Sequence, residues 1–333
     1  MKKLLAFLTI IILLTSSSTH NYGGAPDNGG SEPKDSMLPV IGWFGNRDSL
    51  VYLIQDSSWE IQPGDSTLTA GVSTRVQLSV TDSTAEGYNM DYTFLQFDCA
   101  SVPNNKAGEL TNNITQILSN KLIGKTISFE TDECGQILKF HDEAKLKKQA
   151  KSLFKDGFKE IEKLPWYKEF KKQGVSIKDF TKNIDSDYMV NKYLEDIRLL
   201  FMLHGNAFKR GVRAYHEEAT DSTYEKISQH EVIEEEDGSY RIIFFSRTFI
   251  PSNNLKEQVS NMVENTGNNL IKESFKNNYI EPLGCVVEST LQFEYLSCGY
   301  PYAILKKESV TIGNKTRLKQ KNIHIARFSY DNH

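Results

Sequence analysis

The sequence has few cysteines and lacks the common catalytic motifs. Four cysteines among 333 residues exclude a small, disulfide-dense scaffold. There is no glycine-rich phosphate loop, no Gly-x-Ser-x-Gly elbow and no His-Glu-x-x-His pair, and the seven histidines are scattered. The sequence therefore predicts no catalytic residues, no cofactor and no metal site. We expect a protein that is not an enzyme.

Long apolar runs are absent except near the N-terminus. Lys2 and Lys3 precede the apolar run 4–14, and small polar residues follow it. This order is typical of a secretory signal peptide, which we assign to residues 1–19. The run is too short to span a bilayer, which needs about 20 apolar residues, and no cysteine follows it for lipid attachment. We expect an exported, soluble protein of the periplasm or cell surface, with no transmembrane segment.

Apolar residues are also scarce just after this run, and basic charge does not dominate the chain. The stretch 20–38 is rich in Gly, Asn, Pro, Ser and Asp, so it buries too little surface to order itself and is predicted to be a disordered tether. The formal net charge is −4. A net-acidic chain does not favour general nucleic-acid binding, so we expect no nucleic-acid partner.

One seven-residue pattern, Phe-Glu-x-x-x-Cys-Gly, occurs twice in the chain. Each copy lies in an alternating apolar and polar run that is typical of a strand entering a glycine turn. The repetition indicates an internal duplication, and chance similarity between two hairpins is the alternative. The copies comprise Phe129, Glu130, Cys134 and Gly135, and Phe293, Glu294, Cys298 and Gly299.

The apolar periodicity predicts hairpins on both sides of a helical insert. Residues 39–141 and 205–333 are expected to form two related β-rich repeats. Helical spacing over 142–204, interrupted at Pro165, predicts the insert, and a further helix is expected over 255–270. The predicted fold class is therefore α+β, with bent, half-barrel-like antiparallel sheets and helices packed across their concave face.

The four cysteines leave several arrangements open. A pair between Cys285 and Cys298 is disfavoured because the intervening residues, as one strand, would separate them by roughly 40 Å. Disulfides between the two repeats and four free thiols both remain compatible with the sequence. The candidate disulfide cysteines are Cys99, Cys134, Cys285 and Cys298.

A few polar residues suggest chemistry but favour simpler roles. Glu130 and Glu294 alternate with phenylalanines, so each is expected on the solvent side of its strand. Adjacent residues in the run 216–218, His-Glu-Glu, point to opposite faces of a strand and should not converge on a metal. The acidic run 234–237 precedes Gly238 and is expected to be a hairpin turn. His204 is expected at a helix end, where an imidazole can favour the negative pole of the dipole.

The hairpins at 74–97, 125–140 and 288–307, the last carrying Cys298-Gly299-Tyr300-Pro301, resemble the half-barrel of periplasmic lipoprotein-carrier-like proteins. They are also similar to uncharacterised exported proteins of Gram-negative bacteria. The inserted helices depart from the simple carrier form. Triplets of the type Asp-Ser-(Met/Leu/Thr) are similar to the O-glycosylation signal of one Gram-negative phylum, although Asp and Ser are also ordinary turn residues. The resemblance implies sugar on Ser36, Ser49, Ser66, Ser83 or Ser222.

These observations favour a binding protein over an enzyme. The leading hypothesis is an exported protein that binds an apolar or amphiphilic ligand, or a partner protein, in the concavity of its sheet. The alternative is a structural or assembly component of the cell envelope. An unrecognised hydrolase is a further alternative, although no set of nucleophile, base and orienting group can be named.

Overall fold

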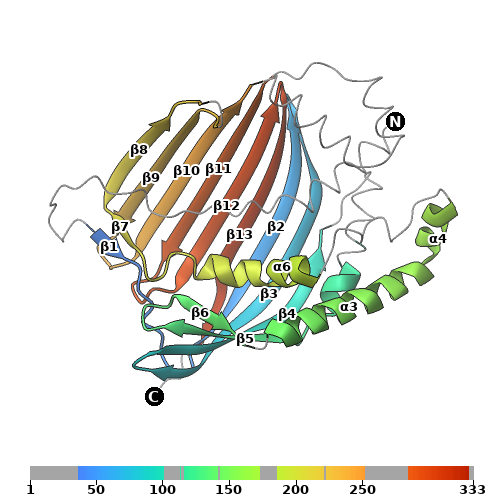
Figure 1. Ribbon diagram of the computed structural model, residues 1–333, viewed down its shortest axis with the longest axis horizontal. Coiled ribbons are helices and arrows are strands. Elements are labelled where there is room, and N and C mark those ends of the chain that lie inside the picture. The colour runs from blue at the N-terminus through green and yellow to red at the C-terminus, as the bar shows by residue number, and fades with distance from the viewer. Residues whose placement is uncertain are drawn as a thin grey trace.

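The computed structural model describes residues 37–100, 113, 116–141, 143–172, 186–220, 223–251 and 284–329. Within them, one open antiparallel sheet of 11 strands has the order β6-β5-β4-β3-β2-β13-β12-β11-β10-β9-β8 (Figure 1). The strands are β2 (Ser49–Gln62), β3 (Asp65–Thr84), β4 (Gly87–Cys99), β5 (Thr126–Asp132), β6 (Ile137–Phe140), β8 (Gly211–Glu217), β9 (Lys226–Glu234), β10 (Tyr240–Ile250), β11 (Cys285–Tyr295), β12 (Pro301–Ile312) and β13 (Lys315–Ser329).

The two sets of strands meet in the middle of this sheet. The strands before the helices form one side, the strands after them form the other, and β2 pairs with β13 along their length, with Ile54 opposite Ile323. The chain therefore builds one continuous sheet from both predicted repeats. The α+β class with a bent antiparallel sheet is confirmed.

The sheet has two distinct faces because side chains alternate along each strand. On β2, Leu50, Tyr52 and Ile54 are fully buried, whereas Val51 and Leu53 on the opposite face are only partly buried. Residues directly opposite each other on neighbouring strands share a face, so the register carries this division across the sheet. We call the face of Tyr52 the inner face and the face of Leu53 the outer face.

In the sequence, the described residues between the two sets of strands form α3 (Glu143–Lys163), α4 (Pro165–Lys172) and α6 (Ser186–Leu200). Pro165 begins α4, as expected of a residue that cannot continue α3. Helix α6 lies across the inner face near one end of the strands (Figure 1). Its apolar side chains belong to the same buried cluster as the strands; they include Val190, Leu194, Ile197 and Leu200. We call this the covered end of the sheet and the opposite end, at the β2–β3 turn, the far end.

A small second sheet joins β1 (Met37–Pro39) to β7 (Ala207–Lys209). Leu38 of β1 is 5% exposed. Met37 and Leu38, which were predicted to belong to the tether 20–38, therefore lie in a strand. The rest of the predicted tether, the predicted signal peptide and the predicted helix 255–270 lie outside the described residues. No helix in the described ranges has the length and apolar character needed to cross a membrane.

Candidate functional site

The two Cys-Gly turns close on one stretch of backbone, residues 40–44. The carbonyl of Cys134 accepts the N–H of Gly42 at 2.9 Å, and the carbonyl of Cys298 accepts the N–H of Trp43, also at 2.9 Å. Two turns that are distant in sequence therefore hold consecutive residues of the segment that leads from β1 to β2. The repeated tract fixes this segment at the covered end of the sheet.

The two turns also share one local geometry. Gly135 and Gly299 have φ angles of 90° and 84°, a conformation that glycine adopts without strain. Their amides donate to the carbonyls of Asp132 and Leu296, three residues earlier, at 3.1 and 2.8 Å. A Cβ atom at Gly299 would lie 2.1 Å from the carbonyl oxygen of Ile41. Only glycine permits the backbone to approach this closely.

His204 fills the space between these turns. It is fully buried, its Nε2 lies 2.9 Å from the carbonyl oxygen of Gly299, and its ring contacts those of Phe44, Phe201 and Tyr295. Burial lowers the pKa of His204 to about 4, against the opposing hydrogen bond to Gly299. The ring is therefore neutral near pH 7 and donates its Nε2–H to that carbonyl. The interpretation of His204 as a charge at a helix end is corrected, because a neutral ring does not favour the dipole.

A buried ion cluster joins α6 to the middle of the sheet. Lys321 of β13 is 7% exposed; its Nζ pairs with Asp196 of α6 and lies 3.6 Å from Asp56 of β2. Burial acts to lower the pKa of Lys321, but the charges of Asp196, Asp56 and Glu195 outweigh it and raise the pKa above its ordinary value. Burial, and then Asp196 and Asp56, raise the pKa of Tyr92 well above its usual range. The cluster therefore marks where the apolar core ends.

Beyond this cluster the inner face first becomes polar. The register places a row of hydroxyl and charged side chains next to one another on the same face. Lys306 lies 3.2 Å from Glu308, and Lys319 and Lys321 follow on the neighbouring strand, so the basic groups concentrate on β12 and β13. The polar row consists of Ser228, Ser246, Ser289, Glu308, Lys319 and Ser58.

At the far end the inner face carries apolar side chains again on β10, β11 and β12, next to Arg317 and Lys315 of β13. Val287 lies opposite Val310, and Cys285 lies opposite Ile312, in adjoining rows. Val310 and Ile312 are 40% and 41% exposed. Ile250 adds to the row of Cys285. We call these five residues the apolar rim; Val310 and Ile312 are exposed, Val287 and Ile250 are partly buried, and Cys285 is buried. The polar row separates the rim from the core.

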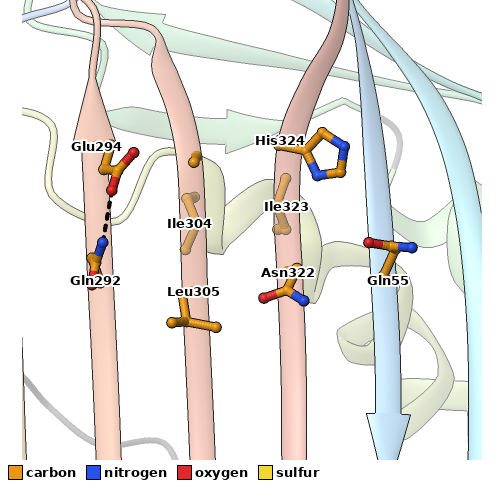
Figure 2. A pocket seen from close by; sticks show the side chains of 9 residues that line it. Gln55, Gln292, Glu294, Ile304, Leu305, Asn322, Ile323 and His324 are labelled. Carbon is orange, nitrogen blue, oxygen red and sulfur yellow. Dashed lines mark hydrogen bonds between the residues drawn. The ribbon is translucent and has the colours of Figure 1, made fainter.

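The outer face carries a shallow polar dip of about 260 Å³ near its centre (Figure 2). Ala303 leaves space between longer side chains of the neighbouring strands, among them Glu294 and His324. Gln292 donates to Glu294 at 2.7 Å. The remaining polar lining comes from Gln55 and Asn322. The dip faces away from the core, so it is a separate surface from the polar row.

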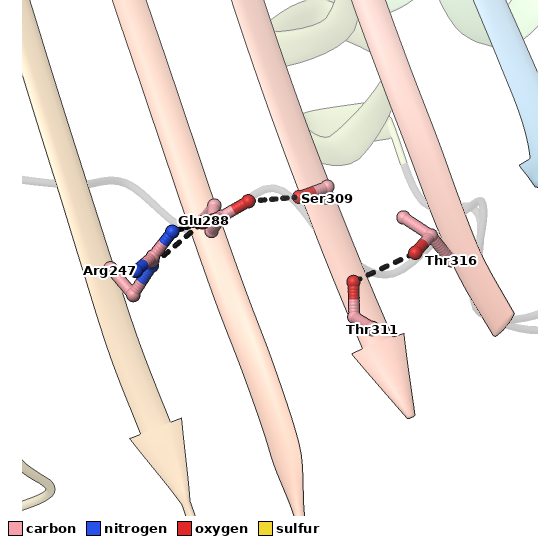
Figure 3. A network of polar contacts seen from close by, with 5 residues as sticks. All are labelled: Arg247, Glu288, Ser309, Thr311 and Thr316. Carbon is pink, nitrogen blue, oxygen red and sulfur yellow. Dashed lines mark hydrogen bonds and ion pairs between the residues drawn. The ribbon is translucent and has the colours of Figure 1, made fainter. Parts of the chain in front are cut away.

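Nearer the far end, the outer face carries a line of polar contacts (Figure 3). Arg247 Nε donates to Glu288 at 2.7 Å, and Ser309 donates to the same carboxylate at 3.5 Å. Thr311 and Thr316 share a hydrogen bond of 2.9 Å. These are cross-strand pairs between exposed or half-exposed groups. These contacts provide hydrogen-bond partners for polar side chains on the surface, and they do not form an enclosed site.

The structure keeps the two repeated glutamates apart. Glu130 and Glu294 are on the outer face, as predicted, and β5 and β11 are six strand positions apart, or roughly 29 Å. Glu130 pairs with Lys139 at 2.9 Å and with His141 at 3.2 Å. The two carboxylates therefore cannot act as a pair on one substrate.

The structure does not bring the cysteines or the other candidate residues from the sequence together into one site. The four candidate disulfide cysteines are all free, so no predicted pair is formed. His216 and Glu217 lie on opposite faces of β8, and His216 is 3.1 Å from Glu225. Residues 234–237 end β9 and begin its turn to β10. Across the described ranges, no group of three or more His, Cys, Asp or Glu side chains is placed to hold a metal ion.

The candidate glycosylation serines lie mostly in strands. Ser49 begins β2 and accepts a hydrogen bond of 2.8 Å from Gln77. Ser66 and Ser83 lie near the two ends of β3, where Ser66 is exposed. Ser36 and Ser222 lie outside the described residues. Modification of these serines stays a prediction.

No protein-family model matches this chain, and no curated protein matches it. A lipovitellin structure that concerns lipid–protein interactions is similar with a TM-score of 0.41 and 10% identity, over 87% of this chain and 26% of that chain. An outer membrane channel from Pseudomonas putida F1 is similar with a TM-score of 0.13 and 7% identity, over 89% of this chain and all of that chain. These TM-scores are too low to carry an argument about fold or function.

Proposed function

We propose that this protein is a non-enzymatic binding protein that holds an amphiphilic ligand on the inner face beyond α6. The ligand's apolar chain lies on the apolar rim, and its anionic head lies on the basic groups of β12 and β13. The observation that supports this is the sequence of bands on one face: a sealed core, the polar row, and the apolar rim, of which Val310 and Ile312 are exposed. An amphiphile matches the last two bands in order, whereas water alone leaves the rim unfavourably exposed.

The binding surface differs from the concavity expected from the sequence. The large aromatic side chains of the inner face, such as Tyr52, Phe129 and Phe293, are fully buried at the covered end. They pack in one cluster with α6, so they are not available to a ligand. The proposed ligand therefore contacts Val, Ile and Lys side chains rather than Phe and Tyr.

The apolar part of the proposal is tested with dodecanoate as probe. Val287 and Val286 are neighbours on β11 whose side chains lie on the inner and outer faces. We expect Val287→Ser to weaken dodecanoate binding about tenfold, because it removes apolar surface from the contact. Val286→Ser is the matched control and should leave binding unchanged. Equal effects of the two variants in calorimetric titrations would contradict the placement of the ligand.

The proposed binding of the anionic head group is tested with a second pair of adjacent residues, on β12. Lys306 lies on the inner face and Lys307 on the outer face. We expect Lys306→Ala to weaken dodecanoate binding several-fold, and added salt to reduce the difference from the parent protein. Lys307→Ala should have no effect. Uncharged dodecyl maltoside should bind equally to both variants, which separates head-group recognition from chain recognition.

Export and the nature of the natural ligand are parts of the same proposal. The basic residues and apolar run at the N-terminus support export, and N-terminal sequencing of the protein from its own cells should show cleavage near residue 19. Native mass spectrometry of that material should show a bound mass that mild organic extraction removes. A chain that is ligand-free at every step and does not bind dodecanoate would remove the proposed function.

A further inference from the structure

The two edges of the large sheet differ in how they are protected. At one edge, β6 is a strand of only four residues, and its Lys139 forms an ion pair with Glu130 of the neighbouring strand β5. At the other edge, β8 has seven residues, and nearly all of them are exposed. In the described part of the chain β8 pairs only with β9. An edge strand of this kind presents a row of backbone N–H and C=O groups to another strand.

Strand β8 lacks several of the features that usually prevent edge pairing, although it carries the charged residues Arg213 and Glu217. It contains no proline and no lysine, and its register with β9 is continuous from Gly211 to Glu217 without a bulge. Val212 is 57% exposed and Tyr215 is 42% exposed. These features favour the addition of a further strand at this edge.

The side chains of β8 also have a self-complementary charge pattern. Arg213, Tyr215 and Glu217 lie on the inner face at two-residue intervals, with the aromatic ring in the middle. A second β8 running antiparallel about Tyr215 would place Arg213 opposite Glu217 of the second copy and the two Tyr215 rings opposite each other. On the outer face the same register places Ala214 opposite His216. Opposite charges directly across a strand pair stabilise it, and aromatic pairs do so as well.

We propose that two copies of this protein associate through antiparallel pairing of their β8 strands about a two-fold axis at Tyr215. The contact is isologous, since each copy contributes the same residues, and it joins two sheets into one. Glu217 also lies 3.9 Å from Lys226 of its own chain, but that pair is exposed and weak, so it competes little with Arg213 of the second copy. The surface is separate from the proposed ligand site and does not depend on it.

Charge reversal tests the pairing in the full chain. We expect the parent protein to reach twice the monomer mass of 37.9 kDa as its concentration rises in analytical ultracentrifugation. Glu217→Arg and Arg213→Glu each place two like-charged pairs in the homodimer and should weaken it about tenfold or more. A mixture of the two variants pairs opposite charges at both positions and should restore the dimer. Restoration also shows that both variants are folded.

Cross-linking tests the register. Residues opposite each other have Cβ atoms about 5 Å apart, within reach of a disulfide, so Tyr215→Cys should form a covalent dimer on mild oxidation. Ala214→Cys, one residue away and opposite His216, should not, and the parent protein controls for its four free cysteines. A monomeric parent protein at all concentrations would overturn the proposal, as would equal weakening of the mixture and the single variants. Covalent dimers from Ala214→Cys but not Tyr215→Cys would overturn this register.

Discussion

The covered end and the far end of the sheet are built from the same strands, but their inner faces differ in burial and in polarity. At the covered end the inner face is closed by α6 and by the 40–44 segment, and its buried polar groups include the ion pair of Lys321 with Asp196 as well as the hydroxyls of Tyr92 and Tyr295, which have no hydrogen-bond partner among the described residues. At the far end the same strands carry serines, lysines and the apolar rim, of which Val310 and Ile312 are exposed. One face of one strand can therefore belong to the core along part of its length and to a more exposed, mixed polar and apolar surface along the rest.

The largest expected effect sharpens this comparison on β13. Lys321→Met should lower the free energy of unfolding by about 4 kcal/mol, because it leaves the Asp196 carboxylate without its buried partner. Arg317→Met, at the far end of the same strand, removes an exposed pair with Glu60 and should cost less than about 1 kcal/mol. Urea denaturation of both variants measures the difference. Similar losses would show that the two ends do not differ in this way.

A second prediction concerns the pH dependence of the covered end. The pKa of His204 is about 4 in the folded state and 6.5 as an ordinary value, so the unfolded chain binds more protons between these pH values. Stability should be constant above pH 6.5 and fall by about 3 kcal/mol as pH decreases to 4. His204→Gln should reduce this fall. Part of it will remain, because burial and Arg213 also lower the pKa of His230. An unchanged pH profile in His204→Gln would contradict the assignment.

Two glycines with the same backbone conformation provide a third test. Gly299 at the covered end and Gly64 in the β2–β3 turn have φ angles of 84° and 79°. Alanine at either position costs about 1–2 kcal/mol for the left-handed conformation. Only at Gly299 would the added Cβ meet backbone, so Gly299→Ala should cost about 2 kcal/mol more than Gly64→Ala. Thermal unfolding of the two variants gives this difference directly.

The smallest effect is expected on the outer face at the far end. Glu288→Gln weakens the contacts of Arg247 and Ser309 shown in Figure 3, all of which are solvent-accessible. Chemical denaturation should show a loss below about 1 kcal/mol, since exposed pairs contribute little. A loss as large as that of Lys321→Met would mean that the far end is as tightly coupled as the core.

The repeated tract shows how much of the structure local sequence can predict. Its glycine turns have the same hydrogen bonds, as the prediction of strand and turn required. The β9–β10 turn also has them: Gly238 has a φ of 79° and its amide donates to Glu235 at 3.1 Å. That turn has no Cys-Gly pair. The shared geometry is therefore explained by turn chemistry alone, and it does not decide between duplication and chance similarity.

Sequence analysis did not find several features of the structure, most of which depend on residues far apart in the chain. β2 was not predicted as a strand, although its alternation of Leu50, Tyr52 and Ile54 is visible once it is sought. The burial of His204 and the ion cluster of Lys321 could not be found either. Each depends on residues more than 90 positions away, such as Gly299 for His204 and Asp196 for Lys321. No periodicity marks such a partner.

The sequence by itself determined the hairpins around the Cys-Gly turns, those glycine turns, the helix break at Pro165 and the α+β class, because these follow from side-chain alternation and backbone preference within a few residues. Only the tertiary structure decided that β2 joins β13 into one sheet, that α6 covers one end of the inner face, and that β8 is an edge strand among the described residues. Those outcomes depend on which distant surfaces exclude water together, and pairing between distant strands is set by the burial of whole faces rather than by any single residue.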